Sequence, residues 1–205
     1  MNLSRRLAAV AALASLFVVP AFAASAFAAA GAEAPAYSEF EQGKKDAKVT
    51  VIEYASLTCP HCAHFANDEF PKLKKEYIDT GKIKFIFRDL PTNNLAVAAA
   101  MLTRCAPGDR GKPMVEALFK DQEKWATSQN PEEALRAQAA LAGMDKEAFD
   151  GCLKNQAMLQ SLQEVAKTAV QKYQVQGTPT FVVDEDVIKG ADYESLKAAI
   201  DKKLK

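Results

Sequence analysis

Two cysteines separated by two residues, Cys59 and Cys62, offer the clearest chemistry in this sequence. A pair at this spacing can close a reversible disulfide or supply two thiolates to a metal ion. The apolar run 49–54 before the pair is typical of a β-strand, and residues 63–77 after it repeat apolar side chains at helical spacing. The pair is therefore predicted to lie where a strand turns into a helix.

The predicted helix start favours a thiolate at Cys59. Pro60 suits the first helical position, because its missing N–H would have no partner there. The unpaired N–H groups and the positive end of the helix dipole then face the Cys59 sulfur. His61 adds to this effect if it is protonated or donates a hydrogen bond. Cys62 lies about one turn further in and is predicted to be the less exposed cysteine.

Glu53 is a carboxylate inside the apolar strand, before the cysteine pair. One interpretation is an outward-facing surface glutamate, because glutamate is seldom fully buried without a partner. The other is a half-buried carboxylate beneath the motif, with a raised pKa, which passes protons to and from Cys62. The sequence leaves both interpretations open.

Residues 1–23 have the layout of a secretory signal. Two arginines form a basic start, residues 7–19 are apolar and uncharged, and small residues precede a cleavage site after Ala23. A second site of the same type follows Ala28. The alternative is an uncleaved membrane anchor, which the short apolar core disfavours. We therefore expect export to an oxidising compartment.

All four cysteines lie beyond both cleavage sites. In an exported chain an even number favours two disulfides over buried free thiols. A bridge between Cys105 and Cys152 would close a loop of about 48 residues, worth roughly 4 kcal/mol in the chain-entropy model. We expect this bridge to be structural, with two free core cysteines and a second redox pair as the alternatives.

The charge of the chain excludes one class of partner. Without the signal, the chain has 24 basic and 26 acidic side chains, a net charge near −2. Because there is no positive excess, nucleic acid is not expected as a partner. The mature length of about 180 residues suits one well-buried domain with room for an insertion.

The remaining pattern predicts a βαβ unit, a helical middle and a closing hairpin. The strand 83–87 follows a helix that Pro71 kinks, and strand, helix and strand in about 40 residues imply a parallel pair. Hairpin strands at 181–183 and 187–189 and a last helix capped by Asp192 close the chain. The helices expected in the middle are 95–105, 113–120, 131–141, 146–153 and 155–173.

Four features of the chain occur together in one family. They are Val-Ile-Glu-Tyr at 51–54, Cys-Pro-His-Cys at 59–62, the helix kinked by Pro71, and Phe-Arg-Asp-Leu-Pro at 87–91. Together they resemble the thioredoxin fold in its DsbA-like form, the exported thiol:disulfide oxidoreductases of bacteria. The resemblance implies an α/β, thioredoxin-like fold with an inserted all-helical domain.

The resemblance also implies how the chain is divided. Residues 49–91 and 174–205 would form the thioredoxin-like domain. The inserted helical domain would comprise 92–173, roof the motif and shape the substrate groove. Residues 24–48 would form an N-terminal segment, with a short element near Tyr37 and Phe40.

Catalytic roles follow from the same resemblance. Cys59 matches the nucleophile and Cys62 the resolving cysteine of a redox-active disulfide. Pro60 and His61 form the dipeptide between them, and His61 matches the residue that tunes the thiolate. Glu53 matches the buried acid of the family.

Thr178-Pro179 has two interpretations. Alone, it reads as an ordinary trans proline that starts an edge strand. The resemblance implies instead the cis-proline loop that lies opposite the active disulfide, where a substrate strand can pair with the N–H and C=O of Thr178. Threonine differs from the valine of the best-known oxidases and also occurs in disulfide isomerases and in other DsbA-like subfamilies. The direction of the reaction is therefore open.

The leading hypothesis is a periplasmic oxidase that introduces disulfides into envelope proteins. Its partners would be reduced secreted proteins and a DsbB-like membrane protein that reoxidises the pair. It would be a monomer without a cofactor or metal. A disulfide isomerase or reductase is the alternative that Thr178 favours. A copper- or zinc-binding envelope protein using Cys59, Cys62 and His64 is a third hypothesis. Haem attachment is excluded, because Ala63 stands where histidine is required.

Overall fold

The computed structural model describes residues 37–190 and 192–205. The predicted signal, 1–23, and the cleavage sites after Ala23 and Ala28 lie outside the described residues. Within the described ranges, no helix is both long and apolar enough to cross a membrane.

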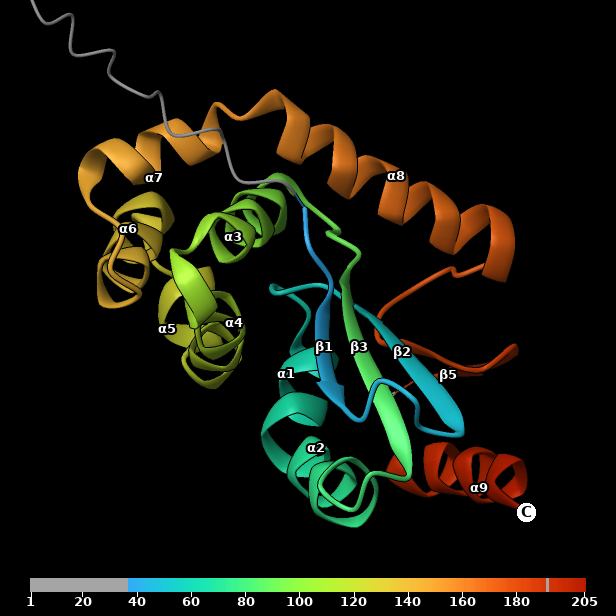
Figure 1. Ribbon diagram of the computed structural model, residues 1–205. Coiled ribbons are helices and arrows are strands. Elements are labelled where there is room, and N and C mark those ends of the chain that lie inside the picture. Colours follow the sequence, from blue (N-terminus) through green and yellow to red (C-terminus); the bar gives the residue numbers. More distant parts are fainter. Residues whose placement is uncertain (1–36, 191) are drawn as a thin grey trace, which may run out of the picture. The chain divides into compact units, whose positions relative to one another are not determined.

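A mixed sheet of five strands, in the order β1, β3, β2, β4, β5, forms the centre of the described chain (Figure 1). β2 and β3 pair in parallel, as predicted, and the other neighbours pair antiparallel. The short element expected near Phe40 is the edge strand β1. The strands are β1 (Phe40–Gly43), β2 (Val49–Ala55), β3 (Ile83–Asp89), β4 (Thr180–Val183) and β5 (Asp186–Lys189).

Successive residues of β2 face two separate cores. Val51 belongs to the larger core, together with residues of the crossover helix and the helical segment. Ile52 belongs to a smaller core, which Ala169 of α8 (Gln156–Tyr173) joins from the opposite face. Because side chains alternate along a strand, Glu53 shares the face of Val51 and points to the side where the cysteine pair lies.

The crossover from β2 to β3 is a helix that contains two π turns. α1 (Pro60–His64) runs into the π turn η1 (Phe65–Glu69), and α2 (Phe70–Leu73) runs into the π turn η2 (Lys74–Ile78). Pro71 has no N–H to donate to the preceding turn, and the wider turn before it accommodates the missing bond. The helix therefore continues past the proline, as the sequence predicts.

The elements between β3 and β4 are helices, as the sequence predicts. Asn or Asp side chains accept hydrogen bonds from backbone N–H groups at the starts of α3, α6, α7, α8 and α9. α4 begins two residues earlier than expected, and α5 was not foreseen. The helices besides α8 are α3 (Asn94–Cys105), η3 (Gly108–Arg110), α4 (Gly111–Lys120), α5 (Gln122–Ala126), α6 (Pro131–Leu141), α7 (Lys146–Leu153) and, after β5, α9 (Tyr193–Leu204).

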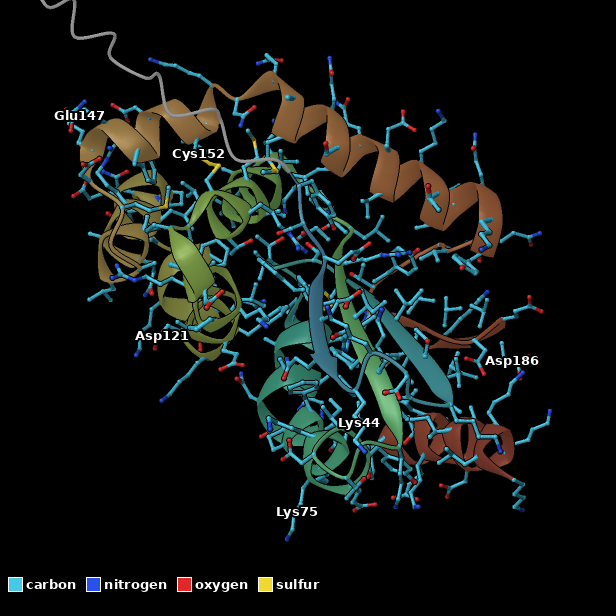
Figure 2. All side chains as sticks on the ribbon, in the orientation of Figure 1. Lys44, Lys75, Asp121, Glu147, Cys152 and Asp186 are labelled. Carbon is cyan, nitrogen blue, oxygen red and sulfur yellow. A yellow bond between two sulfur atoms is a disulfide. The ribbon has the colours of Figure 1, made fainter. Side chains whose placement is uncertain are left out.

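A disulfide joins Cys105, at the end of α3, to Cys152 in α7, with the Cα atoms 6.0 Å apart (Figure 2 labels Cys152). The buried side chains of Trp125 in α5 and Phe149 in α7 belong to the same core as Val51 of the sheet. The helical segment and the sheet thus share one core, and the domain boundaries expected from the resemblance stay a prediction.

A buried ion pair ties β3 to α3. The Arg104 guanidinium lies 2.6 Å from the Asp89 carboxylate, and the two side chains are 0% and 2% exposed. Arg104 also donates to the carbonyl oxygen of Ser38 at 2.6 Å, and its guanidinium carbon lies 3.6 Å from the centre of the Phe40 ring. The pair therefore also anchors the edge strand β1 to the helical segment.

Candidate active site

The turn from β2 into α1 positions the two cysteines of the motif. Cys59 is the N-cap residue of α1 in an extended conformation, and Pro60 occupies the start of the helix. Cys59 is half-buried, whereas Cys62 is fully buried, and both are free thiols. An incoming group can therefore reach Cys59 but not Cys62.

Hydrogen bonds lower the pKa of Cys59 to about 5. The largest contribution comes from the Cys62 thiol, which donates to the Cys59 sulfur, whereas burial acts in the opposite direction. The Thr178 side chain and the backbone N–H groups of Cys62 and His61 lower the pKa further. These N–H groups are the unpaired donors of the helix start, so Cys59 is a thiolate at neutral pH.

The hydrogen bond between the thiols has the opposite effect on Cys62. Donation to the Cys59 sulfur raises the pKa of Cys62 far above its usual value, and burial and the charge of Glu53 raise it further. The two thiols therefore differ in protonation: Cys59 is stable as a thiolate, and Cys62 keeps its proton.

Glu53 is buried beneath the motif. Its side chain is 3% exposed, and its Oε1 atom has no hydrogen-bond partner among the described residues. Burial, with a smaller effect of the Cys59 charge, raises the pKa of Glu53 to about 8. The interpretation of Glu53 as an outward-facing surface residue is therefore wrong. Glu53 also borders a cavity of about 340 Å³ with aromatic walls formed by Phe40, Phe70, Phe85, Phe87 and Phe119.

The loop before β4 brings Thr178 against the motif. The peptide bond between Thr178 and Pro179 is cis. The Cys59 Sγ atom lies 3.3 Å from the Thr178 carbonyl oxygen, to which a protonated Cys59 donates. Because the Thr178 side chain also acts on the Cys59 pKa, this threonine contacts the reactive sulfur through both its backbone and its side chain.

The two histidines near the motif are exposed. His64 pairs through Nδ1 with Asp68 at 2.8 Å, on the same face of the helix. Across 37–190 and 192–205, no group of three His, Cys, Asp or Glu side chains is close enough to hold a metal ion. The geometry therefore gives no support to a metal site built from Cys59, Cys62 and His64.

A cleft of about 600 Å³ lies between the motif and the helical segment, with Thr58, Pro60 and Gln122 in its walls. The Gln122 side chain donates from Nε2 to the carbonyl oxygens of Leu57 and Cys59, at 2.8 and 3.0 Å. The sequence did not single out Gln122, because a glutamine at the start of a five-residue helix carries neither a periodic nor a motif signal.

The model of a family described as thioredoxin matches residues 37–202. The chain belongs to the thioredoxin family. Within this family, disulfide bond formation protein D of Bacillus subtilis is 32% identical over 178 residues, which cover 80% of this chain and 76% of that protein. A protein of Rickettsia bellii that carries the name of a protein-disulfide oxidoreductase is 34% identical over 164 residues, 79% of this chain and 63% of its own length. The chain thus spans less than two thirds of that rickettsial relative.

The thioredoxin-family fold is also found in solved structures. The crystal structure of α-DsbA1 from Wolbachia pipientis matches with a TM-score of 0.74 at 29% identity, covering 82% of this chain and 91% of that one. This likeness confirms the predicted fold class. Together with the sequence relatives, it makes the chain a DsbA-like member of the thioredoxin family.

Proposed function

We propose that this protein is a disulfide oxidase of the bacterial cell envelope, which introduces disulfides into exported proteins through the Cys59–Cys62 pair. The observation that carries the proposal is the opposite shift of the two thiol pKa values, down to about 5 for Cys59 and strongly upward for Cys62. A stable Cys59 thiolate stabilises the reduced pair, so that the disulfide form is a strong oxidant.

The reaction begins on the disulfide form of the pair. A substrate thiolate attacks the Cys59 sulfur, the bond between Cys59 and Cys62 breaks, and a mixed disulfide joins Cys59 to the substrate. Cys62 leaves with the electron pair and takes up a proton. A second substrate thiolate then attacks the substrate sulfur of the mixed disulfide, and Cys59 leaves as a thiolate. The substrate has lost two electrons and gained a disulfide, and the enzyme pair is reduced.

Glu53 supplies the proton that Cys62 takes up. Its carboxyl is kept protonated by burial, which is the larger cause of its raised pKa and does not depend on the Cys59 charge. Once Glu53 has given up its proton, its negative charge raises the pKa of Cys62, which favours transfer of the proton to the Cys62 thiolate. After reduction, a proton from solvent restores the neutral carboxyl.

Substrate thiols reach the pair beside Thr178. Attack falls on Cys59, because Cys62 is fully buried. An extended substrate segment would lie between the Thr178 loop and the cleft next to Pro60. Backbone groups and polar side chains there can form hydrogen bonds to the main chain of a substrate whatever its sequence. The substrate class is thus reduced secreted proteins rather than one defined sequence.

Location and partners complete the proposal. Export rests on the signal layout of residues 1–23. The disulfide between Cys105 and Cys152 suits an oxidising compartment such as the periplasm. There the protein acts as a monomer, and a DsbB-like membrane protein reoxidises the Cys59–Cys62 pair after each cycle.

Equilibration of the mature protein with glutathione redox buffers tests the direction of the reaction. The readout is the fraction of Cys59–Cys62 disulfide, with the state of Cys105 and Cys152 checked separately by mass. An oxidase is expected near roughly −120 mV. A potential near roughly −270 mV would overturn the proposal in favour of the reductase or isomerase that Thr178 also permits.

A further inference from the structure

Gln122 joins the helical segment to the turn that carries the reactive cysteine. It is the first residue of α5, and its side chain is buried. Its amide nitrogen has two hydrogens, and each has a carbonyl acceptor in the turn: Leu57 O at 2.8 Å and Cys59 O at 3.0 Å. Both acceptors lie more than 60 residues earlier in the chain, so the contact is a tertiary one.

Few other hydrogen-bond donors reach the Leu57 and Cys59 carbonyl oxygens of this turn. Leu57 is buried, and in the described part of the chain no donor to its carbonyl oxygen is present besides Gln122. The Cys59 carbonyl also accepts from the Ala63 N–H at 3.1 Å, the first hydrogen bond of α1. Gln122 therefore holds the Leu57–Thr58 and Cys59–Pro60 peptide groups, and the second of these connects Cys59 to the helix.

The orientation of that peptide group decides where the sulfur lies relative to the helix start. The N–H groups of His61 and Cys62 act on the Cys59 sulfur, which requires a fixed geometry between the N-cap residue and the first turn. We propose that Gln122 is a positioning residue, whose amide holds the Leu57 and Cys59 carbonyls and so keeps the Cys59 sulfur over the N–H groups of α1. The inference rests on the proposed redox function of the Cys59–Cys62 pair.

Gln122→Met in the full chain tests the inference, because methionine has a similar length and no donor. We expect Cys59 to titrate about one pH unit higher, and the enzyme to become about tenfold weaker as an oxidant against glutathione. The readouts are the ultraviolet absorbance of the thiolate against pH and the glutathione equilibrium. The variant leaves unchanged the Cys62 thiol, which acts on the Cys59 pKa, and the Glu53 carboxyl, whose own pKa responds to the Cys59 charge. The neighbouring His61 is also unchanged, and neither glutamine nor methionine is charged.

Two further variants separate positioning from a general loss of packing. Gln138→Met makes the same change in the neighbouring helix α6, and its titration and equilibrium should match those of the wild type. Gln122→Asn keeps the amide on a shorter side chain and should give an intermediate shift. Thermal unfolding of each variant shows whether it is folded, since a purely structural role would lower stability without moving the titration of Cys59.

Several outcomes would overturn the inference. The first is a folded Gln122→Met protein with the titration and equilibrium of the wild type. The second is an equal shift of the Cys59 titration in Gln138→Met, which would show that any disturbance near α5 changes the Cys59 pKa. If Gln122→Met does not fold, the test passes to Gln122→Asn. A Gln122→Asn protein with the Cys59 titration and glutathione equilibrium of the wild type then overturns the inference. A wild-type potential near roughly −270 mV would end the oxidase proposal alone, because the shift caused by Gln122→Met remains measurable.

Discussion

The Cys59 sulfur lies 3.3 Å from the carbonyl oxygen of Thr178, although 119 residues separate the two in the chain. The contact is possible because β2, which ends just before the motif, pairs with β4, which begins just after Pro179. The pairing of two central strands thus sets the surroundings of the reactive thiol, and residues from both ends of the domain determine its acidity.

Thr178→Val should raise the pKa of Cys59 above its value of about 5, because the variant lacks the side-chain hydrogen bond that favours the thiolate. We expect a rise of about one unit, which corresponds to about a tenfold weaker oxidant. Titration of the thiolate absorbance measures the change. Thr178→Ser keeps the hydroxyl and is the matched control. Identical titrations for the valine and serine variants would contradict the prediction.

Glu53→Gln should change the pH dependence of stability in the oxidised enzyme, where Cys59 does not titrate. Burial, the larger cause of the raised Glu53 pKa, does not depend on the Cys59 charge, so above pH 4.5 the folded oxidised chain holds a proton that the unfolded chain has released. The free energy of unfolding then falls as pH rises from 4.5 to the raised pKa of the folded state, by up to about 1.4 kcal/mol per pH unit. Glu53→Gln removes this fall, which denaturant unfolding at several pH values can measure. If the free energy of unfolding depends on pH in the same way in the wild type and in Glu53→Gln, the prediction is refuted.

Replacement of both Cys105 and Cys152 by alanine should lower the free energy of unfolding by about 4 kcal/mol, because their disulfide restricts a long loop of the unfolded chain. Denaturant unfolding under oxidising conditions measures the loss. The glutathione equilibrium of Cys59 and Cys62 should be unchanged, since the bridge joins α3 to α7 and not to the motif. Unchanged stability in the double variant would argue against a structural role.

Asp89→Asn should destabilise the fold by about 3–5 kcal/mol, because it leaves the buried charge of Arg104 without its counterion. The double variant Asp89→Leu with Arg104→Met removes both charges and should recover most of this loss. Comparison of the single and double variants by denaturant unfolding checks the prediction. A double variant less stable than Asp89→Asn would contradict the prediction. It would mean that the hydrogen bond from Arg104 to Ser38 contributes more to stability than removal of the unpaired charge recovers.

Local pattern was sufficient to predict the helix start at the motif. Cys59 at the N-cap and Pro60 at the start of α1 follow from the apolar strand, the proline and the helical period, all of which are short-range signals. The alternation in β2 also contained the answer for Glu53, because every second residue faces the larger core. The sequence does not show, however, that the crossover helix covers this face of the sheet and so buries Glu53.

The residues that sequence reasoning missed act through tertiary contacts. Gln122 lies in a short polar segment whose helix has only five residues, and nothing nearby indicates that the amide meets a turn more than 60 residues away. Arg104 sits in an alanine-rich helix and reads as a surface charge, yet it is buried by β1 and Asp89. Buried polar side chains of this kind are specified by their partners rather than by local periodicity.

The connection of the strands also sets the order in which the sheet can be completed as the chain emerges from its N-terminal end. β2 gains its parallel neighbour β3 early, but its other neighbour, β4, follows the whole helical segment. In the proposed export, a chain that enters the compartment from its N-terminal end would present Cys59, Cys62 and Cys105 before Cys152 has appeared. In that interval the only thiols within reach of Cys105 are the two of the motif, and the central strand has an open edge. Under the proposed export, the protein would thus be most exposed to wrong disulfide pairing while it is itself a newly exported chain.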